Sequence, residues 1–212
     1  MTPELDQYIL DHISPEPEQL RRLYRHTHLH RLYPRMCSGH LQGRILKMLT
    51  AMAAPRRVIE LGTYTGYSAL CIAEALSGDA ELHTIEINDE WADDIRATFD
   101  ESPFGHRITL HTGDALELIP AIGGRWDMAY IDANKRNYIE YLDALLPLME
   151  PGGFIIADNT LWDGKVADTA SSHDAQTLGV AAFNDYVASH PRLETVILPI
   201  RDGLTLLRVL PS

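Results

Sequence analysis

Hydrophobic positions along this chain follow two alternating patterns. Short runs rich in β-branched and apolar residues, bounded by Gly, Asn or Asp, are typical of buried strands, whereas apolar residues three or four positions apart indicate amphipathic helices. Strands are expected at residues 58–61, 81–87, 107–111, 126–132, 154–158, 193–200 and 204–210. Helices are expected between them, at about residues 69–76, 88–99, 114–122, 137–149 and 177–189.

The order of these elements predicts the fold. Strands and helices alternate from residue 58 to residue 158, which is typical of an open, mostly parallel α/β sheet with right-handed crossovers and helices on both faces. Only Arg201-Asp202-Gly203 separates the last two strands, so these must form an antiparallel hairpin. We therefore expect a seven-stranded, Rossmann-like sheet that ends in an antiparallel hairpin.

The N-terminal segment lies outside this alternation. Helices are predicted at residues 2–12, 14–32 and 41–53, and both Thr2-Pro3 and Ser14-Pro15 are helix-start signals. The second helix carries a basic face of Arg21, Arg22, Arg25 and Arg31. It could be a lid, a dimer arm or a cover for the sheet. We expect one domain, in which residues 1–54 cover the site and residues 55–212 form the core.

Charge and composition narrow the partners. The formal net charge of −12 over 212 residues argues against a general surface for nucleic acid or anionic membrane, because both are polyanions. No stretch approaches the ~18 apolar residues of a membrane span, and no signal-peptide pattern is present. Cys37 and Cys71 lack C-x-x-C spacing, so packing is expected for both, with a reactive Cys37 as the alternative. A cytoplasmic protein with a small-molecule partner is predicted.

The turn after the first core strand, Val58 to Ser68, indicates a cofactor site. Its glycines, Gly62 and Gly66, have G-x-x-x-G spacing, whereas the dinucleotide fingerprint is G-x-G-x-x-G. Glu60 lies two residues before Gly62, where its charge would oppose a pyrophosphate but suit an ammonium or sulfonium group. The turn therefore favours S-adenosylmethionine over NAD.

Acidic residues follow the other strands, and ligands of open α/β sheets bind beyond these carboxyl ends. Glu86 lies 24 residues after Gly62, the usual offset for an acid that accepts the ribose hydroxyls of either cofactor. Asp114 is placed to accept from an adenine amino group, or to cap the following helix, and the two roles are compatible.

Two further strand ends predict a metal site. Asp132 and Asp158-Asn159 end strands that should be neighbours, and their hard oxygen ligands suit Mg²⁺, Ca²⁺ or Mn²⁺. Beside a divalent cation the ammonium form of Lys135 is disfavoured, which suits a general base; without a metal, Lys135 would pair with Asp132 or Asp158. A zinc site at His26, His28 and His30 is the weaker alternative, because no third ligand is evident beside the i, i+4 pair.

Together these motifs resemble the cation-dependent O-methyltransferases, the group that includes catechol O-methyltransferase and the caffeoyl-CoA O-methyltransferases. The motifs are Glu60 to Ser68, Ile85-Glu86, Gly113-Asp114-Ala115, Asp132-Ala133-Asn134-Lys135, Pro151-Gly152-Gly153, Asp158-Asn159, Leu161 to Val166 and Asp202-Gly203-Leu204. Each is modest alone, but their order is specific. The resemblance spans about residue 36 to the C-terminus and implies a class I S-adenosylmethionine-dependent methyltransferase fold.

The resemblance also implies a role for each site residue. Contacts to S-adenosylmethionine or its pocket wall fall to Glu60, Gly62, Tyr64, Gly66, Ser68, Glu86, Asp114, Ala115 and Asp132. The implied metal ligands are Asp132, Asp158 and Asn159, and the implied base is Lys135. The expected reaction is methylation of a catechol-like aromatic diol, with the metal chelating both oxygens. By the same resemblance we expect a homodimer.

Departures from the family leave alternatives open. Asn134 replaces the aromatic residue that precedes the lysine in the animal catechol enzyme, so Trp162 or the segment from Tyr33 to His40 is expected to hold the ring instead. Arg201 stands where related bacterial sequences usually have glycine. Three rivals remain: a tRNA hydroxyuridine methyltransferase that uses the basic helix, a non-catalytic S-adenosylmethionine-binding protein, and an NAD-dependent dehydrogenase.

Overall fold

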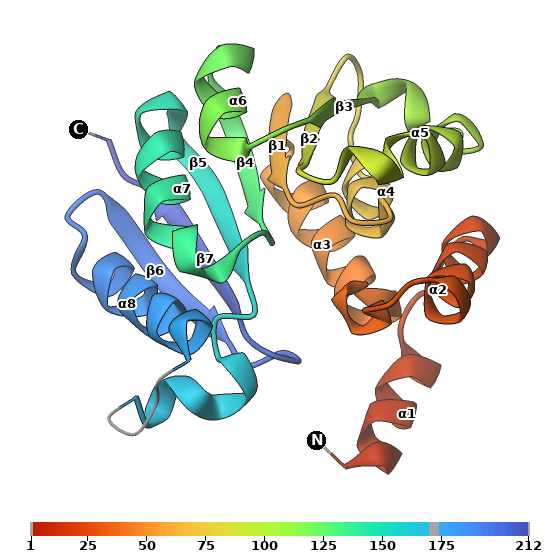
Figure 1. The fold of residues 1–212 in the computed structure, drawn as a ribbon, viewed down its shortest axis with the longest axis horizontal. Helices are drawn as coiled ribbons and strands as arrows, with labels where there is room; N and C mark the ends of the chain where they lie inside the picture. The colour runs from red at the N-terminus through yellow and green to blue at the C-terminus, as the bar shows by residue number, and fades with distance from the viewer. Residues whose placement is uncertain (1, 170–173, 212) are drawn as a thin grey trace.

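A computed structural model describes residues 2–169 and 174–211 (Figure 1). Within these ranges one seven-stranded sheet has the order β3-β2-β1-β4-β5-β7-β6. The strands are β1 (Arg57–Leu61), β2 (Glu81–Glu86), β3 (Ile108–Thr112), β4 (Trp126–Ile131), β5 (Met149–Asp158), β6 (Leu193–Leu198) and β7 (Leu204–Val209). Strands β1 to β5 pair in parallel, and β7 is antiparallel to both β5 and β6. The predicted sheet and hairpin are confirmed, and the strand order reverses between β1 and β4.

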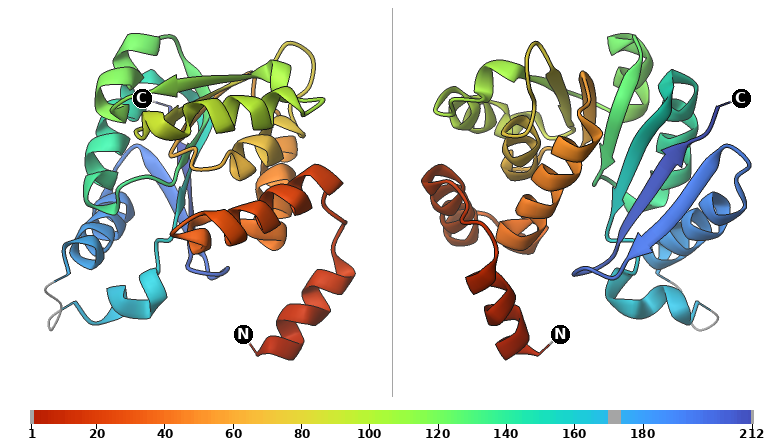
Figure 2. Two further views of the ribbon diagram at one scale, coloured as in Figure 1. Left: turned by 45° about the vertical axis from the view of Figure 1, so that its right-hand side comes forward. Right: turned by 180° about the vertical axis from the view of Figure 1, so that it is seen from behind.

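Helices cover both faces of this sheet (Figures 1 and 2). The α-helices of the described residues are α1 (Pro3–His12), α2 (Glu18–His30), α3 (Gly39–Ala53), α4 (Tyr67–Ala73), α5 (Ala92–Asp100), α6 (Ala115–Ile122), α7 (Tyr138–Leu145) and α8 (Ala175–Ser189). One core contains Ile59 of β1 with residues of α6, α7 and α8, and the other contains Val58 with residues of α2 to α5. Successive residues of a strand thus enter opposite cores, which explains the nearly continuous apolar runs of the central strands.

Two predicted boundaries are wrong. Helix α2 begins at Glu18 rather than at Ser14-Pro15, because Pro17, with ψ of 148°, is still extended and also restricts the residue before it. Strand β5 begins at Met149 rather than Phe154. Met149 pairs with Trp126 and the register then shifts, so the expected Pro-Gly-Gly turn is an irregularity within the strand.

The N-terminal helices differ in how they pack. Helix α2 buries Leu20, Leu23 and Thr27, and it lies beside α4. Helix α1 has no buried residue and projects from the rest of the protein (Figures 1 and 2). Its N-cap is the predicted one, since Thr2 Oγ1 accepts from the Leu5 N–H at 3.4 Å. Among the described residues, no helix has the length and apolar character needed to cross a membrane.

Candidate active site

The carboxyl ends of β1, β2, β4 and β5 border a cleft of about 960 Å³, a size typical of small-molecule sites. The cleft also receives the segment from Tyr33 to Ser38 and the β6–β7 hairpin tip. Sequence-predicted residues on its wall are Gly62, Tyr64, Ser68, Glu86, Ala115, Asp132, Lys135, Asp158 and Asn159. The structure therefore brings most of the candidate residues to one place, at the reversal of strand order where ligands of such sheets bind.

Two glycines shape the turn between β1 and α4. Gly62 has φ of +98°, and a Cβ atom there would lie 2.1 Å from the Asp132 carbonyl oxygen. Gly66 has φ of +86°, and its Cβ would meet the Phe99 ring at 2.6 Å. Only glycine permits these conformations and close approaches. The turn is thereby packed directly against the end of β4, which places a ligand of the turn beside Asp132.

Glu60 lies behind the cleft wall rather than on it. Its side chain is fully buried, and the hydroxyls of Ser68 and Thr84 each donate to its carboxyl group at 2.5 Å. Burial raises the pKa of Glu60 to about 8, in spite of these two hydrogen bonds. At neutral pH the group is mostly protonated, so the negative charge expected at this position is not presented to the cleft.

Glu86 is held by main-chain donors at the end of β2. Its Oε2 accepts from the Tyr64 N–H at 2.7 Å, and its Oε1 accepts from the Asn88 N–H at 2.9 Å. Burial raises the pKa of this carboxyl, although the backbone donors oppose the rise. The carboxyl also lines the cleft, where it can accept from hydroxyl groups of a bound ligand.

Asp114 acts as the N-cap of α6, as one of its two predicted roles requires. Its Oδ1 accepts from the Leu116 N–H at 2.8 Å, and its side chain is exposed outside the cleft lining. The neighbouring Ala115 is buried and lines the cleft. A contact between Asp114 and an adenine amino group stays a prediction.

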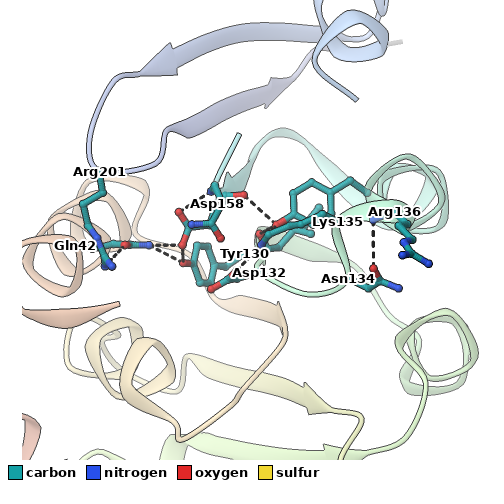
Figure 3. A network of polar contacts seen from close by, with 11 residues as sticks. Gln42, Tyr130, Asp132, Asn134, Lys135, Arg136, Asp158 and Arg201 are labelled. Carbon is teal, nitrogen blue, oxygen red and sulfur yellow. Dashed lines mark hydrogen bonds and ion pairs between the residues drawn. The ribbon is translucent and has the colours of Figure 1, made fainter. Parts of the chain in front are cut away.

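Lys135 is fixed between two oxygens (Figure 3). Its Nζ lies 2.6 Å from Asp132 Oδ1 and 2.6 Å from the Tyr138 hydroxyl oxygen. That hydroxyl lies 3.0 Å from the Asp158 carbonyl oxygen and 3.2 Å from the Ile131 carbonyl oxygen, either of which can accept its proton. Sequence reasoning missed Tyr138, although its position three residues after Lys135 was an available signal.

Asp158 is buried at the end of β5 and surrounded by donors. Its Oδ2 accepts from Gln42 Nε2 at 2.5 Å and from the Tyr130 hydroxyl at 3.0 Å, and its Oδ1 accepts from the Asn159 N–H at 2.8 Å. Burial and the nearby charge of Asp132 raise the pKa of Asp158 to about 6. Gln42 was also missed, although a polar residue within the apolar stripe of a predicted helix was a signal for it.

The donors at these strand ends fit a divalent cation. Asp132, Asp158 and Asn159 supply two carboxylates and an amide oxygen to one cleft. Asn159 has φ of +57°, and its side chain makes no hydrogen bond to a described residue. Such oxygen donors suit Mg²⁺, Mn²⁺ or Ca²⁺. Across residues 2–169 and 174–211, no group of three His, Cys, Asp or Glu side chains could hold a metal, so a site here requires the Asn159 amide.

The cleft mouth carries aromatic and sulfur-containing side chains. Tyr33, Met36, Cys37 and Trp162 line it, whereas the His40 ring hydrogen-bonds the Ser14 carbonyl oxygen. Burial raises the pKa of Cys37 to about 11, so the thiol is protonated at neutral pH and poorly nucleophilic. These surroundings favour packing over reactivity for Cys37.

The basic face of α2 is largely paired with acidic side chains. Arg21 contacts Glu18, Arg22 Nη2 lies 3.8 Å from Glu101 Oε2, and Arg31 Nη2 lies 2.7 Å from Asp94 Oδ2. These ion pairs reduce the charge available to a phosphate backbone and so weaken the tRNA alternative. The side chains of His26, His28 and His30 are exposed on the same helix.

Residues 10–210 match a family model described as O-methyltransferase. Caffeoyl-CoA O-methyltransferase 2 from Zea mays is 34% identical over an alignment of 218 positions, and the alignment covers 97% of this chain and 82% of the relative. Tricin synthase 1 from Oryza sativa subsp. japonica is 36% identical over an alignment of 220 positions, and the alignment covers 96% of this chain and 87% of the relative.

Solved structures of similar proteins share the fold. The O-methyltransferase TomG from Streptomyces achromogenes, solved in complex with SAM, has a TM-score of 0.91 at 28% identity and covers 100% of both chains. The O-methyltransferase from Bacillus cereus, solved in complex with SAH, has a TM-score of 0.90 at 28% identity and covers 97% of each chain. The match to TomG covers the whole chain and therefore includes the strands that border the cleft.

Proposed function

The chain belongs to the O-methyltransferase family, and on this premise we propose that it transfers the methyl group of S-adenosylmethionine to a hydroxyl of a catechol-like small molecule in a reaction that depends on a divalent metal. The observation that carries the proposal is the convergence of Asp132, Lys135, Asp158 and Asn159 in one cleft beside the Gly62 turn. Two carboxylates, an amide and an amine at one place suit metal-assisted deprotonation of a hydroxyl.

The methyl donor would occupy the β1–β2 half of the cleft. Glu86, held by the Tyr64 and Asn88 N–H groups, is oriented to accept from the ribose hydroxyls. Gly62 leaves the space for a ligand to approach the backbone next to Asp132. Tyr64 and Ala115 complete this wall, whereas Glu60 supports it from behind through Ser68.

The metal would be held by Asp132, Asp158 and Asn159. When bound, a divalent cation supplies a Lewis acid that lowers the pKa of an acceptor hydroxyl, and S-adenosylmethionine supplies an electrophilic methyl group. Gln42 and Tyr130 hold the Asp158 carboxylate in one orientation, so the ligand set is largely preorganised.

Lys135 is the proposed base, and it would take the hydroxyl proton at Nζ. Asp132 and Tyr138 restrict the position of this nitrogen, and the side chain is only 8% exposed, so water has little access to it. When Lys135 is neutral, the lone pair on its Nζ can accept the proton of the acceptor hydroxyl. Holding both reactants beside this nitrogen would supply much of the rate.

An aromatic ring is the acceptor that the mouth of the cleft suits best. Tyr33, Met36 and Trp162 offer flat or polarizable surfaces, and Asn134 stands on the wall beside Lys135. A vicinal diol places two oxygens at the spacing that one metal can chelate. The acceptor class is therefore a small aromatic diol.

A direct assay tests this function. Purified protein, S-adenosylmethionine, Mg²⁺ and a panel of catechols should yield methylated product by mass spectrometry, and EDTA should abolish the product until Mg²⁺ is restored. A matched panel of simple phenols should react far less, because they offer one oxygen to the metal. Activity that EDTA leaves unchanged would remove the metal from the proposal.

We also propose that two copies associate through the N-terminal helices. Leu5 and Tyr8 of α1 and Met48 and Met52 of α3 are between 46% and 76% exposed, which is unusual for such large apolar side chains. Light scattering after size-exclusion chromatography should give twice the mass of the chain, and Tyr8→Glu should shift the protein towards the monomer. A monomeric mass for the unaltered protein would contradict the proposal.

A further inference from the structure

Arg201 has an unusual backbone for its residue type. It lies at the tip of the β6–β7 hairpin with φ of +50°, in the left-handed region that favours glycine. Its side chain is nevertheless directed to the cleft, which it helps to line. A side chain kept at a strained position within a candidate site points to a function for that side chain.

The Arg201 guanidinium is held in place but not neutralised. Its Nη1 donates to Gln42 Oε1 at 2.6 Å, and it forms no ion pair with a carboxylate of the described residues. Of the two acids near the tip, Asp202 accepts from the Asp163 N–H, and Asp163 lies 4.0 Å from Lys165 Nζ. Asp202 lies near enough to feel the Arg201 charge, but no ion pair with a described carboxylate occupies the guanidinium, so its remaining N–H groups are available to a ligand.

The side-chain amide of Gln42 connects the Arg201 guanidinium to the Asp158 carboxylate. Gln42 accepts from Arg201 through its oxygen and donates to Asp158 through its nitrogen, so a single amide group separates the guanidinium from the Asp158 carboxylate. Arg201 and Lys135 lie on opposite sides of Asp158 (Figure 3). An aromatic acceptor with its hydroxyls near Lys135 can thus extend its other end towards Arg201.

We propose that Arg201 selects acceptors that carry a carboxylate on the aromatic ring or its side chain, away from the two hydroxyls. The proposal rests on the function proposed above and names the acceptor class for the same site. A guanidinium presents two parallel N–H donors that match a carboxylate. Dihydroxybenzoates and dihydroxycinnamates have this combination of groups, whereas catechol lacks the acid.

Binding measured with a matched pair of acceptors tests the proposal. We would titrate 3,4-dihydroxybenzoate and catechol into the protein with S-adenosylhomocysteine and Mg²⁺, by calorimetry, and measure KM for both. Arg201→Gly, which also relieves the backbone strain, should weaken the binding of 3,4-dihydroxybenzoate roughly 10- to 100-fold and the binding of catechol less than about threefold. The affinity of Arg201→Lys for 3,4-dihydroxybenzoate should lie between those of the unaltered protein and Arg201→Gly, because lysine keeps the positive charge but lacks the two parallel N–H donors.

Controls separate the possible failures. Arg208→Met removes an exposed arginine of β7 that pairs with Glu194 outside the cleft. This variant should bind both acceptors with unchanged affinity. An equal loss for both acceptors in Arg201→Gly, or no loss for either, would overturn the selection of carboxylates while leaving the methyltransferase function intact. Absence of binding and turnover of both acceptors by the unaltered protein would instead contradict the function itself.

Discussion

The ends of β1 and β5 each bury a carboxylic acid, but the two surroundings give the acids different chemistry. Glu60 is enclosed by the Ser68 and Thr84 hydroxyls behind the cleft wall, and its pKa of about 8 leaves it mostly neutral at pH 7. Asp158 lines the cleft beside Asp132, and its pKa of about 6 leaves it mostly ionised. Burial alone therefore does not identify a functional acid. Both acids feel the charge of Asp132, so access to the cleft is what distinguishes the proposed metal ligand from the supporting residue.

The largest effect should follow from removing the acid of β5. Asp158→Ala should lower kcat/KM roughly 10³-fold, about 4 kcal/mol, because the proposed metal site loses an anionic ligand. The measurement is product formation at saturating Mg²⁺, with calorimetry to show that S-adenosylhomocysteine still binds. Asp93→Ala, which removes a fully exposed carboxylate of α5, is the control and should be unchanged. Full activity in Asp158→Ala would show that Asp158, like Glu60, is not needed for the reaction.

Removal of the proposed base should have the next largest effect. Lys135→Met should lower kcat roughly 10²-fold, about 3 kcal/mol, with little change in cofactor affinity. Lys135→Arg should be equally impaired, since a guanidinium keeps the charge but does not release its proton at working pH. Lys47→Met on α3, which removes an amine paired with Glu74 outside the cleft lining, should leave the rate unaltered. Recovery of the rate in Lys135→Arg would assign Lys135 an electrostatic role instead.

Glu60 should affect stability rather than chemistry. Its pKa is raised from 4.5 to about 8 in the folded protein, so the native state binds the extra proton and stability falls as pH rises through this interval. Glu60→Gln mimics the neutral acid. Between pH 6 and pH 8 the free energy of unfolding should therefore fall by about 2 kcal/mol less in this variant than in the unaltered protein. Urea unfolding at both pH values, compared with Glu117→Gln on the exposed side of α6, measures the difference. An unchanged pH dependence in Glu60→Gln would show that Glu60 is ionised.

The smallest effect concerns the residue that positions Lys135. Tyr138→Phe removes the hydroxyl 2.6 Å from Lys135 Nζ and should lower kcat roughly three- to tenfold, about 1 kcal/mol, with KM unchanged. Added to Lys135→Met it should cause no further loss, because both changes act on one group. Tyr186→Phe loses a comparable hydroxyl contact to Asp143 outside the cleft and serves as the control. Additive losses in the double variant would make Tyr138 independent of Lys135.

The acids at the strand ends could be predicted from the sequence, whereas the contacts that surround them could not. Acids at strand ends were predictable, because parallel strands end at one edge, and Asp132, Asp158 and Asn159 do line one cleft. Contacts between distant segments were not, since Gln42 and Asp158 lie 116 residues apart and meet only through the packing of α3. The neutral state of Glu60 was equally hidden, because it depends on how tightly α4 and β2 close around it.

The most direct test of the account is whether a divalent cation binds at the end of β5. Manganese titration followed by electron paramagnetic resonance, with S-adenosylhomocysteine present, should show one saturable site per chain. Affinity should fall at least about tenfold in Asp158→Ala and remain unchanged in Glu60→Gln. No saturable site in the unaltered protein, or equal affinity in Asp158→Ala, would contradict the central claim that Asp158 holds the metal.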